Sequence, residues 1–219
     1  MTRKAAAIGV LLLWLTSAAQ AQKEATVLTR HAVQDGNSTL VQYGSGTVIS
    51  KDDTGFLVLS CAHVLESGGE HGQGTLKVTT AKGRTHLAQM LECDAVRDLS
   101  LIRVKSRQAD VGVAVLADDE TYRPGMKVYK CGHPGGNDFI KEEGKIRDYS
   151  SRSSGFENLI ASARSSSGDS GGGVYRVRDD RLIGVVWGGG DDGLRAVRLP
   201  QIRHFLDAAK VRITKATKR

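Results

Sequence analysis

The sequence lacks the features that mark several common protein classes. Its only cysteines, Cys61, Cys93 and Cys131, form no C-x-x-C pair, so no structural zinc site is expected. An odd number of cysteines leaves at least one of them outside any intramolecular disulfide, and three single pairings remain open. Internal repeats and low-complexity blocks are also missing. These absences argue against a repeat architecture and against a zinc-stabilised module.

The positive charge is not arranged as it is in a nucleic-acid-binding segment. The formal net charge is +7, and several basic residues gather at the end of the chain, in Lys210–Arg219. No aromatic residue is interleaved there for stacking on bases. We therefore interpret residues 207–219 as a basic C-terminal tail that begins as a solvated helix end, and we expect no nucleic-acid partner.

The chain has no apolar run long enough for a membrane span. The longest, Ala5–Leu15, covers about half of the ~20 residues that a span requires, so an integral membrane anchor is the weaker alternative. Two basic residues precede the run, and Ala19-Gln20-Ala21 follows it as a small-residue cleavage pattern. The sequence therefore predicts a signal peptide over residues 1–21 and a protein exported to the periplasm or secreted.

The remaining sequence has short segments rich in β-branched and apolar residues, separated by glycine-containing turns. This density of short strands predicts an all-β barrel or sandwich. Helical spacing of apolar residues occurs only near the end, in Gln201–Ile213. A polar stretch at 116–126, which contains Pro124-Gly125, is the predicted linker between a first half at 22–115 and a second half at 127–206. The expected strand segments are Thr39–Ser50, Gly55–Leu65, Gly74–Leu91, Asp98–Val104, Lys127–Gly132, Gly172–Gly190 and Leu194–Pro200.

The stretch "SSGDSGGGVY" places Ser170 within a cluster of glycines. Glycine is entropically costly to order, so the cluster needs a geometric reason. Such a reason is a sharp turn whose backbone N–H groups, those of Gly168 and Ser170, converge on the oxyanion formed when a serine attacks a carbonyl. The sequence therefore predicts that Ser170 is a nucleophile and that these two amides form its oxyanion hole.

A serine nucleophile needs a base, and the base needs an acid that fixes its tautomer. The candidate base is His63, which ends an apolar strand in "LSCAHVL"; His133 in "CGHPGG" is a weaker rival. Asp98 is the candidate acid, because the strand that follows would hold it at an edge. Asp94 is its competitor.

These segments resemble one family when taken in order. "GSGTVIS", "LSCAHVL", "DLSLIRV", "GHPGG", "SSGDSGGGVY" and "LIGVVWGGG" follow the order of the chymotrypsin/trypsin-like serine proteases, and most closely resemble the compact bacterial, HtrA-like protease domain. The resemblance implies two antiparallel six-stranded β-barrels, with a C-terminal helix closing the second. It also implies that His63 and Asp98 come from the first barrel and Ser170 from the second.

The sequence departs from the digestive members of this family. No "IVGG"-like segment follows a basic processing site, so insertion of a new N-terminus onto Asp169 is not supported, and we expect Asp169 to bond locally in its turn. Cys61 lies two residues before His63 and is interpreted as a small buried residue rather than a reactive thiol. No PDZ-like region follows the predicted protease domain.

The family implies a primary specificity pocket lined by the position six residues before the serine and by the strand carrying Trp187 and Gly188. Arg164 occupies that position here. An arginine at the pocket base would favour an acidic substrate side chain. The alternative is that a shortened loop turns Arg164 to solvent.

The sequence thus predicts a serine endopeptidase that acts on proteins or peptides and needs no metal or organic cofactor. Two alternatives remain open. One is a catalytically silent binding module of the same fold, and the other is an esterase that uses the same three residues.

Overall fold

A computed structural model describes residues 20–65, 74–106, 110–151, 155–190 and 193–211. Most of the predicted signal peptide and residues 212–219 of the predicted tail lie outside these ranges. Among the described residues, no helix has the length and apolar character that crossing a membrane requires.

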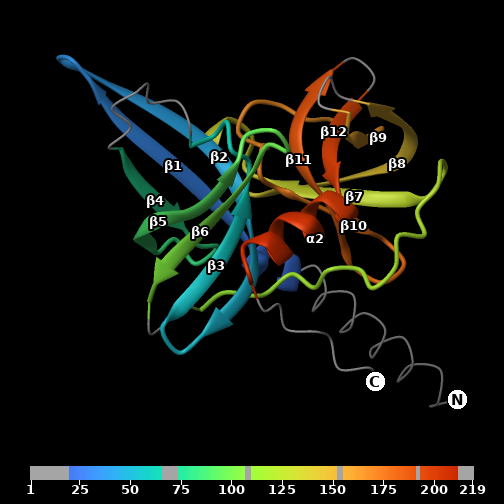
Figure 1. The fold of residues 1–219 in the computed structure, drawn as a ribbon, viewed down its shortest axis with the longest axis horizontal. Helices are drawn as coiled ribbons and strands as arrows, with labels where there is room; N and C mark the ends of the chain where they lie inside the picture. The colour runs from blue at the N-terminus through green and yellow to red at the C-terminus, as the bar shows by residue number, and fades with distance from the viewer. Residues whose placement is uncertain (1–19, 66–73, 107–109, 152–154, 191–192, 212–219) are drawn as a thin grey trace, which may run out of the picture.

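The first half of the chain forms a closed barrel in the strand order β1-β2-β3-β6-β5-β4, with every neighbouring pair antiparallel (Figure 1). Strands β1 and β2 form a long hairpin that extends beyond the rest of the barrel (Figure 1). The strands are β1 (Thr26–Asp35), β2 (Ser38–Asp52), β3 (Gly55–Ser60), β4 (Thr75–Thr79), β5 (Thr85–Asp94) and β6 (Leu99–Lys105).

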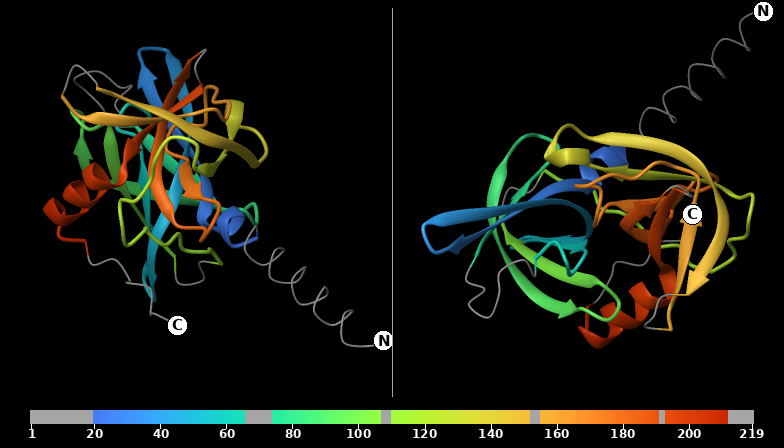
Figure 2. Two further views of the ribbon diagram at one scale, coloured as in Figure 1. Left: turned by 90° about the vertical axis from the view of Figure 1, so that its right-hand side faces the viewer. Right: turned by 90° about the horizontal axis from the view of Figure 1, so that it is seen from above.

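The second half forms another closed antiparallel barrel, in the order β10-β11-β12-β9-β8-β7. Helix α2 (Leu199–Ala208) follows its last strand, and the view from above again shows the two barrels side by side (Figure 2). The strands are β7 (Lys127–Gly132), β8 (Ile140–Ser151), β9 (Glu157–Ala161), β10 (Gly173–Arg176), β11 (Leu182–Gly190) and β12 (Gly193–Arg198). The predicted fold class of two six-stranded barrels and a C-terminal helix is confirmed.

The strands whose side chains form the core have alternating or continuous apolar positions. On β6, Leu99, Leu101 and Val104 are buried, as the pattern of that segment predicts. The helix differs from the prediction in its bounds, because it begins at Leu199 and ends at Ala208 rather than spanning 201–213. Pro200 lies in the first turn, where its fixed φ suits a helix start and its missing N–H costs no hydrogen bond.

The segment between the barrels ties them together. The amide of Ala114 donates to Val48 O on β2, and the amide of Ala117 donates to Leu182 O on β11. Leu116 also forms an isolated bridge with Leu182. One strand from each barrel is thereby bonded to this segment, which fixes the cleft between the barrels where the site lies.

Candidate active site

Ser170 lies in a tight turn that only glycines at two positions permit. Gly168 has φ +93° and Gly171 has φ +92°. A Cβ atom on Gly168 would lie 2.5 Å from His133 O, and one on Gly171 would lie 2.0 Å from Ser45 O. A side chain at either position would therefore clash with backbone as well as strain the chain. Both glycines are required by close approach and by positive φ.

The amides of this turn divide into two groups. Those of Asp169, Gly171 and Gly172 donate to backbone carbonyls. Within the described part of the chain, the amides of Gly168 and Ser170 donate to no backbone carbonyl. The Ser167 carbonyl accepts a 2.6 Å hydrogen bond from the amide of Gly135, and a trans peptide directs its N–H opposite to its carbonyl. The N–H of Gly168 consequently points away from Gly135, on the opposite side of the peptide from the Ser167 carbonyl.

A buried ion pair between Lys130 and Asp169 holds the turn to strand β7. Lys130, on β7, bonds to Asp169 Oδ2, and the two side chains are 3% and 0% exposed. The amide of Ser166 donates to the same carboxylate oxygen over 3.0 Å. The expected local bonding of Asp169 is present, but the lysine was missed. The only sign of this lysine in the sequence is a charged residue placed between Tyr129 and Cys131, both of which are buried in the strand.

His63 follows the end of β3 and is held by Asp98 through two separate groups. Its Nδ1 lies 2.9 Å from both carboxylate oxygens of Asp98, and its amide donates to Oδ1 over 3.0 Å. A carboxylate only accepts, so Nδ1 carries the proton and Nε2 keeps its lone pair in the neutral ring. The side chains are 41% and 11% exposed, respectively. This arrangement leaves an imidazole that can accept a proton at Nε2.

Asp98 is held in an unusual backbone conformation, with φ +59°. Non-glycine residues adopt this region rarely and at a cost of about 1 kcal/mol or more, which the surrounding structure must support. The buried Leu99 that opens β6 and the two hydrogen bonds from His63 supply that support. The strain points to a position whose side-chain direction matters.

The cleft brings the histidine and the serine to one cavity. His63 and Ser170 both line a cavity of about 220 Å³, together with Gly168, Gly135 and Tyr43. The Ser170 hydroxyl donates to Trp187 O over 3.4 Å, a long hydrogen bond that leaves it weakly held. The first barrel thus contributes His63 and Asp98, and the second contributes Ser170 and the two amides.

The rival residues lie elsewhere. Asp94 is bonded to Arg97, through the amide at 2.9 Å and the guanidinium at 2.7 Å, and so closes the turn before β6. His133 lies under Gly168 with its Nδ1 donating to Asn137 O over 2.9 Å. Burial lowers the pKa of His133, which favours the neutral ring. The structure therefore places Asp98, not Asp94, against the histidine.

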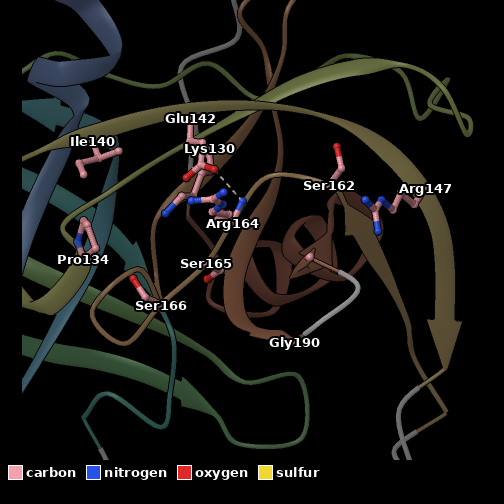
Figure 3. Close-up of a pocket in the computed structure, with 11 residues that line it drawn as sticks. Lys130, Pro134, Ile140, Glu142, Arg147, Ser162, Arg164, Ser165, Ser166 and Gly190 are labelled. Atoms are coloured by element: carbon pink, nitrogen blue, oxygen red, sulfur yellow. Dashed lines mark hydrogen bonds between the residues drawn. The ribbon is translucent and has the colours of Figure 1, made fainter.

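The sequence-predicted specificity residues divide between a pocket and a strand. Arg164 lines a pocket of about 600 Å³ with Lys130, Glu142 and Arg147, and its amide donates to Glu142 Oε1 over 3.0 Å (Figure 3). Arg164 is exposed, so the pocket is open to water on its side. Neither Trp187 nor Gly188 lines this pocket.

Trp187 and Gly188 lie on β11, next to Ser170. The indole N–H of Trp187 donates to Asn158 Oδ1 over 3.1 Å, which fixes the ring. Gly188 pairs with Arg195 on β12, and a Cβ atom added to it would meet no atom within 4 Å. Among the described strands, only β12 pairs with residues 188–190.

The cysteines are present as thiols, two buried and one exposed. Burial raises the pKa of Cys131 to about 12, so it is a protonated core residue. Cys61 is fully buried behind the histidine, as expected, and its thiol donates to Val186 O over 3.0 Å. Cys93, on β5, is the exposed one.

Comparison with known proteins identifies the family of this chain. The model of the trypsin-like peptidase domain matches residues 44–185. The "Putative protease Do-like 14" of Arabidopsis thaliana is 32% identical over 107 residues, which are 48% of this chain and 23% of the relative. Serine protease HTRA1 of Xenopus laevis is 34% identical over 91 residues, 42% of this chain and 18% of the relative. The matches thus span less than a quarter of either relative's length.

Solved structures show the same fold. The active form of the Rv3671c protease from M. tuberculosis superposes with a TM-score of 0.73 at 22% identity, over 92% of this chain and 86% of the other. Its inactive form superposes with a TM-score of 0.71 at 21% identity, over 89% and 93% of the two chains. From the family match over most of both barrels, the chain belongs to the family of trypsin-like peptidase domains.

Proposed function

We propose that the protein is a serine endopeptidase in which Ser170, His63 and Asp98 form the catalytic triad. The observation that supports the proposal is that the Asp98-bonded His63 and Ser170 both line the same cavity. The amides of Gly168 and Ser170, which donate to no backbone carbonyl within the described residues, belong to the same turn as the serine. Neither a metal nor an organic cofactor is required, because nucleophile, base and oxyanion donors all come from the chain.

The reaction proceeds through an acyl-enzyme. Ser170 Oγ attacks the scissile carbonyl while His63 Nε2 takes the hydroxyl proton. Asp98 stabilises the imidazolium, and the amides of Gly168 and Ser170 donate to the oxyanion. His63 then returns the proton to the leaving amine. A water molecule repeats the sequence on the ester, which frees the serine.

We further propose that substrates are proteins or peptides bound in extended form along β11, at Trp187 and Gly188. The pocket beside Arg164 receives the side chain on the acyl side of the cut. Arg164 and Arg147 bring two positive charges to the lining and Glu142 brings one negative charge, and Figure 3 draws Arg147 across the pocket from the other two. The charge of Lys130 is balanced by Asp169. The net positive lining favours an acidic side chain.

A peptide-library cleavage profile tests the pocket. Wild-type protein should cleave after Asp or Glu, and Arg164→Ala should lose that preference. Arg123→Ala, which removes an exposed arginine from the segment between the barrels, is the matched control and should keep it. A wild-type profile with no acidic preference would contradict the assignment of Arg164 while leaving the triad untouched.

Export completes the proposal. Cleavage after Ala21 would release the protease to the periplasm or the medium, with residues 1–21 removed. Turnover of unfolded casein by wild-type protein, and its loss in Ser170→Ala, tests the activity. Failure of both proteins to cleave casein, together with saturable binding of a partner, would favour a non-catalytic binding module.

A further inference from the structure

Three side chains of different types that can bind a metal ion lie close together, and the candidate catalytic histidine is one of them. The ligand atoms of Cys61, His63 and Asp98 all lie within 4.8 Å of one another. Among the described residues, this is the only group of three such side chains. We propose that the group is a reversible Zn²⁺ site, and that zinc held there inhibits the protease.

The donor set suits zinc. Thiolate sulfur, imidazole nitrogen and carboxylate oxygen are its usual protein ligands, at about 2.3, 2.0 and 2.1 Å, which places tetrahedral ligand atoms roughly 3.3–3.6 Å apart. His63 Nδ1 and the Asp98 oxygens are now 2.9 Å apart in a hydrogen bond, so they must separate by about 0.4 Å to admit the ion. The Cys61 thiol must give up its hydrogen bond to Val186 O and turn toward them. A water molecule would complete the tetrahedron.

The charge of the filled site favours binding. Cys61 and Asp98 are both buried, so an unbalanced charge is costly there. Without metal the three side chains carry the single negative charge of Asp98. With Zn²⁺, one thiolate and one carboxylate, the charges sum to zero. A soft thiolate also selects zinc over magnesium and calcium, which prefer oxygen ligands.

The protons balance as follows. The Cys61 thiol loses its proton to solvent as the sulfur–zinc bond forms. The Nδ1 proton of His63 also leaves that nitrogen, and a solvent exchange places one proton on Nε2, so that the ring stays neutral. Nothing is oxidised or reduced. One proton per zinc ion is released in total.

This tautomer explains inhibition, in a step that rests on the proposed function. An imidazole with its proton on Nε2 cannot accept the Ser170 proton. Asp98, bound to the metal, can no longer stabilise an imidazolium. Zinc at this place would therefore inhibit without touching Ser170, and removal of the metal by a chelator would restore activity.

Binding is tested without catalysis on full-length Ser170→Ala protein. Titration with Co²⁺, a spectroscopic substitute for Zn²⁺, should give a thiolate-to-cobalt charge-transfer band that added Zn²⁺ abolishes. Cys61→Ala and Cys61→Ser in the same background should lack the band. Cys93→Ser, which removes the exposed thiol on β5, is the matched control and should keep it.

Inhibition is then measured on active protein. Zinc should inhibit wild-type and Cys93→Ser protein with the same half-inhibitory concentration, and loss of one ligand in Cys61→Ala should raise that concentration at least about tenfold. Equal inhibition of Cys61→Ala and wild type, or a cobalt band that depends on Cys93, would overturn the proposal. If the cobalt band appears but the wild-type protein has no peptidase activity, the metal site is supported and only the proposed function is refuted.

Discussion

The ion pair beneath the Ser170 turn gives the most demanding stability prediction. In Lys130→Met, the aliphatic stem is retained and the charge is lost. Asp169, which is fully buried, then keeps only Ser166 as a hydrogen-bond donor to Oδ2, through its amide at 3.0 Å and its hydroxyl at 3.5 Å. Its Oδ1 has no partner among the described residues. Removing one member of a buried pair typically costs about 3–5 kcal/mol, because the remaining charge is left uncompensated.

The assay is urea unfolding at neutral pH. With an m-value of about 2 kcal/mol/M, the expected loss of free energy of unfolding lowers the midpoint by roughly 2 M. The double variant Lys130→Met/Asp169→Asn removes the uncompensated charge and should recover most of the midpoint. It should still have a lower kcat, because the turn that carries the Gly168 and Ser170 amides has lost its anchor. A midpoint for Lys130→Met within 0.5 M of wild type, on the scale of about 1 kcal/mol, would refute this reasoning.

Three further predictions concern residues around the cavity. Asp98→Asn should lower kcat by about 10⁴-fold, because the amide no longer fixes the tautomer, whereas Asp94→Asn should leave peptide turnover near wild type. Gly168→Ala should destabilise the protein and reduce turnover, because the added Cβ atom would lie 2.5 Å from His133 O. Gly83→Ala, at φ +75° with no atom within 4 Å of the added Cβ, should cost only the backbone strain. Thermal unfolding and peptide turnover of both variants test this difference. Burial lowers the pKa of His133 in the folded state, so the stability that this residue contributes should be fully present above its unfolded pKa of about 6.5 and should be lost as the pH falls through the folded pKa. Urea midpoints measured from pH 7.5 to 4.5 should therefore fall less for His133→Asn than for wild type. An identical fall in both proteins would contradict a lowered pKa for His133.

The strand pattern predicted more of the first barrel and the end of the second than of the remainder. Strands β3, β6 and β7 follow apolar runs that their sequences show directly. Strands β1, β8 and β9 were not singled out. The sequence of β8, "IKEEGKIRDYSS", is largely polar and exposed, and β9 has only five residues, so neither shows a clear period. That the second barrel has six strands, which β8 and β9 complete, followed only from the family resemblance.

The local sequence predicted residue types at the site but not their partners. Glycines around Ser170 indicated a turn, and the structure supplies the reason, which is close approach to the backbone of Ser45 and His133. The Lys130–Asp169 pair joins residues 39 positions apart, and only the barrel register brings them together. The same holds for Cys61 and Asp98, which lie next to His63: Cys61 directly follows β3, Asp98 directly precedes β6, and these two strands are paired. Contacts between residues far apart in the sequence cannot be predicted from any single stretch of it.

The central claim is that His63 activates Ser170. It is tested most directly by treating wild-type protein with a fluorophosphonate and locating the adduct by peptide mass spectrometry. We expect a single adduct on Ser170 in wild-type protein, its absence in Ser170→Ala, and labelling slowed by orders of magnitude in His63→Ala. Equal labelling of wild type and Ser170→Ala, or an unchanged rate in His63→Ala, would contradict the account.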